Sequence, residues 1–137
     1  MTEYLLDTDH LSYLQEGHPK VVERLTALPL DDRVFTSVVS VAELLRGVYL
    51  LAKSRRQQKL LELYHQVIRQ MEEILPITLT VAEKFAEIEV KLRKKGKPIP
   101  VNDLWVASLA LVRVAVLVTN DEHFAYVDNL NVENWIR

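Results

Sequence analysis

The stretch Tyr4-Leu5-Leu6-Asp7-Thr8-Asp9, residues 4–9, changes abruptly from apolar to acidic. A short apolar run of this kind is typical of a buried strand, and the polar residues after it are typical of the turn that follows. Residues 114–119 form a second apolar, β-branched run, which leads to Asp121. The sequence therefore predicts two buried strands, each with a carboxylate close behind its end.

Strands and helices alternate along the rest of the chain. Further strands are predicted at residues 33–36, 74–79 and 130–132, and helices at residues 11–15, 21–28, 38–53, 57–73, 81–95 and 103–112. This alternation favours an α/β fold with a parallel sheet that helices cover on both faces. Ligands bind such sheets outside the carboxyl ends of the strands, which is where Asp7 and Asp121 are expected to lie.

Length and composition limit the classes of protein that this chain can belong to. With 137 residues, 49% of them apolar, and no linker, we expect a single domain that spans residues 1–137. The absence of cysteine excludes disulfides, thiol nucleophiles and cysteine-ligated zinc. No basic segment precedes an apolar one at the N-terminus, and the longest apolar run is too short and interrupted to span a membrane. We therefore expect a soluble, cytoplasmic protein without membrane association.

The net charge of -2 argues against a protein that holds nucleic acid by its overall charge. Lysines and arginines do gather locally, at residues 53–59 and 91–97. Each cluster alone is explained by a solvated helix face. Any role in binding nucleic acid must therefore depend on local patches.

Four acidic residues are the candidates for a functional site: Asp7, Glu43, Asp103 and Asp121. Each of them also has a structural explanation. Asp7 could cap the first helix, although Thr8 or Asp9 could do so equally well. Ser40 and Glu43 match a capping box, unless the helix begins earlier, near Ser37, which would leave Glu43 free. An Asn-Asp turn would account for Asp121.

Asp103 can likewise be explained either as part of a functional site or by its place at the start of a helix. Asn102 is a suitable N-cap, and Asp103 at the first helical position would complement the helix dipole. Capping does not explain why the acid is followed directly by the mostly apolar residues 104–107.

The four acids together indicate a chemistry that no single one does. Carboxylates gathered at one edge of a sheet repel one another and lose solvation, which raises their pKa values, and a bound cation relieves this cost. Ligation by oxygen alone favours Mg²⁺ or Mn²⁺ over zinc. Such sites cleave or transfer phosphoryl groups with a metal-activated water.

Other chemistries lack their motifs. The glycines are too few and scattered for a phosphate loop, and no serine lies in a nucleophile elbow. The four histidines, His10, His18, His65 and His123, lack metal-ligand spacing, so surface or capping roles are expected for them. His123 alone lies near the proposed site.

Four segments, taken together, resemble the PIN-domain family, and within it the VapC-type toxins. They are LLDTDHL at residues 5–11, SVVSVAEL at 37–44, PIPVNDLWVA at 98–107, and TNDEHF at 119–124 with VENW at 132–135. The resemblance covers the whole chain with the segments in order. One departure is Pro100, which stands where many relatives have glycine.

The resemblance implies a three-layer α/β/α sandwich with a central parallel sheet of about four to five strands. It implies an endoribonuclease dependent on Mg²⁺ or Mn²⁺, often aimed at tRNA or rRNA. It also implies a VapB-type antitoxin that covers the acidic cleft, and a homodimer. Asp7, Glu43 and Asp103 would be the main catalytic and metal-binding acids and Asp121 the fourth, with Thr119 and Asn102 in support. Asn120 stays unassigned, and Asp9 is expected to cap the first helix.

Two alternatives remain from the residues. Asp7-Thr8-Asp9 resembles the D-x-D motif of haloacid-dehalogenase-type phosphatases, with Asp7 as nucleophile and Asp9 as general acid. That motif usually continues to a threonine, where this chain has Leu11, and its later acidic motif is missing. The other alternative is a non-catalytic domain that binds RNA or protein, whose acids are caps and hold no metal.

Overall fold

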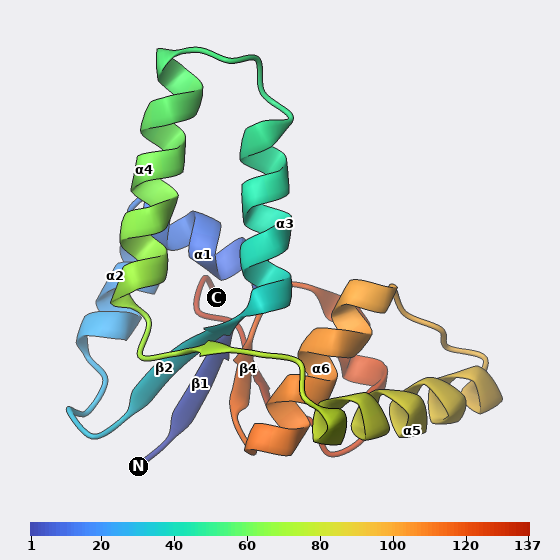
Figure 1. Ribbon diagram of the computed structural model, residues 1–137. Coiled ribbons are helices and arrows are strands. Elements are labelled where there is room, and N and C mark those ends of the chain that lie inside the picture. Colours follow the sequence, from blue (N-terminus) through green and yellow to red (C-terminus); the bar gives the residue numbers. More distant parts are fainter.

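The computed structural model describes residues 1–137, which fold around a five-stranded parallel sheet (Figure 1). The strands are β1 (Glu3–Leu6), β2 (Arg33–Ser37), β3 (Ile74–Leu75), β4 (Val116–Val118) and β5 (Val132–Glu133), in the order β3-β2-β1-β4-β5. Every neighbouring pair is parallel. The predicted α/β class with a parallel sheet is therefore confirmed.

Six α-helices and a short 3-10 helix connect the strands. They are α1 (Thr8–Gln15), α2 (Pro19–Thr26), α3 (Val38–Tyr49), α4 (Arg55–Gln70), α5 (Leu79–Lys95), α6 (Val101–Arg113) and η1 (Glu122–Tyr126). The strand predicted at 74–79 ends at Leu75, because Pro76 has no amide hydrogen for the ladder and Thr78 already caps α5. β4 begins only at Val116, since Val114, with φ 58°, still ends α6.

Helices cover both faces of the sheet. This is required because the apolar side chains along β1 point alternately to one face and the other. Leu5 faces one side, where it packs in a cluster with residues of α5 and α6 such as Leu92 and Leu109. Tyr4 and Leu6 face the other side and pack in a cluster with residues from all of α1 to α4. Figure 1 shows the two layers on opposite sides of the sheet. The three-layer α/β/α architecture is confirmed.

Hydrogen bonds fix the carboxyl end of β1 from both neighbouring strands. The amide of Asp7 donates to the carbonyl of Val118 at the end of β4, over 3.0 Å. On the other side, the buried hydroxyl of Thr36 in β2 donates to the carbonyl of Leu6, over 2.9 Å. Because all strands run in one direction, the segments that follow β1, β2 and β4 leave the sheet at this same edge. No helix in the structure combines the length and apolar composition needed to cross a bilayer.

Candidate metal centre

Asp7 lies directly after β1 and is buried, with 7% of its surface exposed. One carboxylate oxygen accepts from the Thr8 amide (2.9 Å) and the other from the Thr119 hydroxyl (2.8 Å). Asp7 is thus itself the N-cap of α1. Burial, followed by the charge of Asp9, nevertheless raises the pKa of Asp7 to about 7. The protein alone therefore does not compensate the charge of this carboxylate.

Glu43 lies in the second turn of α3 and does not cap it. The N-cap is Ser37, whose hydroxyl oxygen accepts from the Ser40 amide (3.0 Å). Of the two expected helix starts, α3 therefore has the earlier one, and Ser40 and Glu43 form no capping box. The Glu43 carboxylate instead accepts from the Thr8 hydroxyl (2.7 Å). Thr8 thereby links α3 to the segment that carries Asp7. Sequence reasoning did not single out Thr8, because a threonine beside an acid carries no signal of its own.

Asp103 lies in the first turn of α6, which begins at Val101 with Pro100 at the cap position. The prediction that Asn102 caps this helix is wrong: Asn102 lies inside the first turn, and α6 has no side-chain cap. Proline at the cap position fixes the backbone before the helix but supplies no hydrogen-bonding side chain.

The His123 ring lies between two of the acids. Its Nδ1 is 3.1 Å from a carboxylate oxygen of Asp103 and 3.1 Å from one of Asp121. Asp121 also accepts from the His123 amide (2.9 Å) and caps η1. These three residues offer ligand atoms within 4.8 Å of one another, which makes them a candidate cation site. The capping role of Asp121 resembles the predicted turn, whereas the position of His123 between the carboxylates was not predicted.

The acids affect one another electrostatically. The pKa of Asp103 is raised, first by burial and then by the charges of Asp121 and Glu43, against the hydrogen bond from His123. The charge of Asp103 in turn contributes to the raised pKa of Asp7. The hydrogen bond to Asp103 and the charge of Asp121 raise the pKa of His123. The structure therefore brings all four predicted acids into one coupled group, which we name the acidic cluster.

Thr119 orients two members of this cluster. Its hydroxyl donates to Asp7 and its hydroxyl oxygen accepts from the amide of Asp121 over 3.0 Å. Thr119 follows β4, so a single side chain holds the acids of two strands in a fixed relation. These two hydrogen bonds are the contacts through which the orienting role predicted for Thr119 would act.

Asp9 lies within α1 and does not cap it, contrary to expectation. One of its oxygens accepts from the Asn120 amide and the other lies near Nδ1 of His10, both at 2.8 Å. His10 is fully buried, and its Nε2 accepts from the Trp135 amide (3.2 Å), so Nδ1 carries the proton and donates to Asp9. The surface or capping role expected for His10 is therefore wrong. These bonds tie the loop after β4 and the C-terminal segment to α1.

The donor set of the acidic cluster fits a divalent cation. Asp103 and Asp121, with the neighbouring His123, have ligand atoms within 4.8 Å of one another, and two of the four carboxylates, those of Asp7 and Asp103, have raised pKa values. Hard divalent cations prefer carboxylate oxygens as ligands. A positive ion would also offset the free-energy cost of ionising the buried Asp7 carboxyl, which the protein alone does not compensate.

The chain is similar to known proteins over nearly its whole length. The PIN domain family matches residues 4–130. Ribonuclease VapC1 of Haemophilus influenzae (strain R2866) is 30% identical over 136 residues, which are 98% of each chain. The solved structure of VapBC-1 from nontypeable Haemophilus influenzae superposes with a TM-score of 0.86 and 28% identity, covering 99% of this chain and 100% of that one.

A second solved structure agrees with the first. It is VapBC2 from Rickettsia felis bound to a DNA fragment from their promoter, with a TM-score of 0.84 and 30% identity over 98% of this chain and 99% of that chain. The match of the family to residues 4–130, together with relatives that are similar from end to end, shows that the chain belongs to the PIN domain family.

Proposed function

We propose that this chain is a divalent-metal-dependent endoribonuclease that acts as the toxin of a toxin–antitoxin pair. The observation that carries the proposal is the acidic cluster, in which the buried Asp7 has a pKa of about 7 and feels the charge of Asp103. Nucleases of the PIN family need a divalent metal, and this chain has the acids to hold one. Its relatives include proteins named Ribonuclease VapC1 and VapC5.

In this proposal Asp7, Glu43 and Asp103 are the main metal-binding and catalytic acids, and Asp121 is the fourth. Because the ligands are mostly carboxylates, we propose Mg²⁺ or Mn²⁺ as the ion. When bound, it would supply positive charge and a readily deprotonated water for attack on a phosphodiester. Thr8 and Thr119 keep the carboxylates of Glu43 and Asp7 oriented for this task. The proposed substrate is structured RNA such as tRNA.

The geometry argues against the two alternatives. A phosphatase of the haloacid-dehalogenase type would need Asp9 free to give up a proton, but both of its oxygens are engaged by His10 and Asn120. A non-catalytic domain would use its acids as caps. Asp7 and Asp121 do cap helices, but capping leaves the positions of Glu43 and Asp103 unexplained.

A partner protein is part of the proposal. The two solved relatives named above are VapBC structures. We propose that an antitoxin of the VapB type covers the acidic cluster of this chain. Until a metal fills it, the cluster is strongly negative, so an arginine or lysine of the partner can pair there with a desolvated carboxylate. A toxin homodimer is proposed as well, from the family resemblance alone.

The products of the reaction test the proposed function. Purified chain incubated with a tRNA mixture and Mg²⁺ or Mn²⁺ should cleave it, and EDTA should stop the cleavage. Because the nucleophile is a water, the products should carry a 5′-phosphate and a 3′-hydroxyl, as judged by ligation and phosphatase treatment of the new ends. A 2′,3′-cyclic phosphate would instead mean that the RNA 2′-hydroxyl attacks, and the proposed chemistry would be wrong.

Substitution of single acids tests their roles. The cleavage rate should fall by about 100-fold or more in each of the variants Asp7→Asn, Glu43→Gln and Asp103→Asn. Loss of a direct metal ligand should have a larger effect than loss of a residue that only hydrogen-bonds to a ligand. Asp121→Asn should be milder, about tenfold, if it holds the metal through water. Glu122→Gln, on the exposed neighbour of Asp121, is the control and should keep full activity. Wild-type rates for the first three variants would remove these acids from the site.

The stability of the metal-free protein should depend on pH through Asp7. An unfolded Asp ionises near pH 3.9, and the folded carboxyl at about 7. The folded state thus binds more protons between these values, and the free energy of unfolding falls as pH rises from about 4 to about 7. Thermal melts in EDTA should show that the free energy of unfolding falls across this window by on the order of 2–4 kcal/mol more in the wild type than in Asp7→Asn. Parallel pH profiles of the two proteins would contradict the burial cost at Asp7.

Competition between metal and antitoxin tests the partner. If a basic side chain of the antitoxin pairs with the acidic cluster, its affinity should fall as Mg²⁺ or Mn²⁺ rises, beyond the effect of monovalent salt at equal ionic strength. Calorimetry of the two proteins at several metal concentrations measures this. An affinity indifferent to divalent metal would place the antitoxin elsewhere on the toxin.

A further inference from the structure

A surface hollow adjoins the acidic cluster on the side of α3. Its volume is about 330 Å³, near the lower end of the range for ligand pockets. Val38, Ala42 and Ile77 supply apolar walls, while Glu43 and Asn102 belong to the segments of the cluster. The hollow therefore shares one side chain, Glu43, with the acidic cluster, and Asn102 directly precedes Asp103 in the chain.

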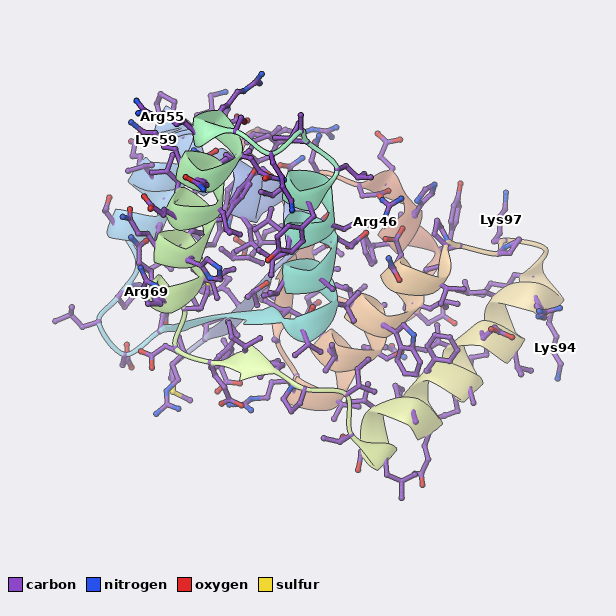
Figure 2. The ribbon with its side chains drawn as sticks, turned by 45° about the horizontal axis from the view of Figure 1, so that its top comes forward. Arg46, Arg55, Lys59, Arg69, Lys94 and Lys97 are labelled. Atoms are coloured by element: carbon purple, nitrogen blue, oxygen red, sulfur yellow. The ribbon has the colours of Figure 1, made fainter.

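Arg46 stands at this hollow, one helical turn beyond Glu43 on α3. Its side chain is exposed and takes part in none of the ion pairs or side-chain hydrogen bonds that other arginines form. Figure 2 shows it on the side of α3 that faces α6, whereas Arg55, Lys59 and Arg69 lie along α4. A planar guanidinium without a carboxylate partner is suited to bind a phosphate through two hydrogen bonds.

Asn102 contributes from the opposite side, on α6. It does not cap that helix, and its amide group forms no hydrogen bond within the protein. An exposed amide can both donate to and accept from the edge of a nucleobase. The hollow thus combines apolar walls, one free cation and one free amide from two separate elements.

A second hollow on the other flank of the cluster is less suited to an anion. It is lined by Thr119, Asn120 and Asp121, and its arginine, Arg137, lies 3.8 Å from Glu122. The other members of its lining that carry charge are acidic. Of the two flanks, only the α3 side offers a cation without an acidic partner.

We propose that the α3 hollow is a nucleotide subsite, which holds the RNA nucleotide next to the scissile phosphate. Arg46 binds its phosphate, the apolar walls contact the base or sugar, and Asn102 hydrogen-bonds the base edge. This inference rests on the proposed ribonuclease function and names the part of the chain that positions its substrate. An overall charge of -2 makes such a local cation necessary for holding RNA beside four carboxylates.

RNA binding without cleavage tests the subsite directly. In an Asp7→Asn background with Mg²⁺, a fluorescently labelled pool of random-sequence 12-nucleotide RNAs is titrated and followed by anisotropy. Arg46→Ala should weaken binding about tenfold, and the slope of log affinity against log salt should flatten by about 0.7, as for one lost phosphate contact on a single strand. Ala42→Leu, which fills the hollow, should weaken binding similarly without changing that slope.

Two matched variants serve as controls. Arg69→Ala removes the same charge from the exposed face of α4, and Ala86→Leu adds the same side chain on the exposed face of α5. Both should bind RNA like the Asp7→Asn parent. Leucine is a good helix former, so Ala42→Leu and Ala86→Leu should both remain folded. In the wild-type background, Arg46→Ala and Ala42→Leu should raise KM more than they lower kcat.

The other outcomes separate the subsite from the function. If wild type cleaves tRNA but Arg46→Ala and Ala42→Leu bind the RNA pool like their controls, the subsite is wrong and the proposed function stands. If Ala42→Leu changes the molar mass in light scattering and leaves RNA affinity unchanged, the hollow is an interface between copies of the chain, and the subsite is equally overturned. Failure of wild type to cleave any RNA with metal contradicts the proposed function itself.

Discussion

The carboxylate of Asp7 is buried at the end of the central strand, and burial, together with the charges of Asp9 and Asp103, raises its pKa to about 7. Ionising it beside Asp103 adds repulsion to lost solvation. The surrounding structure supplies two hydrogen bonds to Asp7, from Thr8 and Thr119, and they do not cancel this cost. The part of the ionisation cost that remains would be offset by a positive ion bound beside Asp7. The fold thus trades stability of the empty protein for affinity toward a cation.

Parallel topology makes this arrangement possible. β1 lies at the centre of the sheet, so the segments after β2 and β4 reach Asp7 from both sides: α3 with Glu43 and the loop with Thr119. A buried network of Asp9 and His10 then fixes that loop and the C-terminal segment onto α1. The acids come from four separate segments, yet hydrogen bonds between these segments hold the geometry without a bound ion.

The sequence predicted the layers and the acids, but not the contacts that orient them. Apolar runs and helical periodicity depend on local spacing, and they located the strands and helices to within a few residues. Helix starts were less predictable, because Ser37 and Ser40 are both suitable caps in the sequence, and the structure uses Ser37. The positions of His10 and His123 were not predicted, since each contacts a residue distant in sequence, Trp135 and Asp103, in addition to the nearby Asp9 and Asp121.

A nuclease with an acidic centre and a net charge of -2 must hold a polyanion against its own field. Screening limits the reach of exposed charges to about 8–10 Å at moderate salt, so lysines on the far face of the molecule add little at the site. The cations that matter are those within a turn or two of the acids, and their effect is largest where no carboxylate already pairs with them. On α3 this condition is met by Arg46, because the helix that brings Glu43 to the cluster carries Arg46 to its rim on the same side. In the proposed function and subsite, the same helix supplies a ligand for the metal, Glu43, and an attraction for the RNA, Arg46, so that a chain with a net charge of -2 can still engage its substrate.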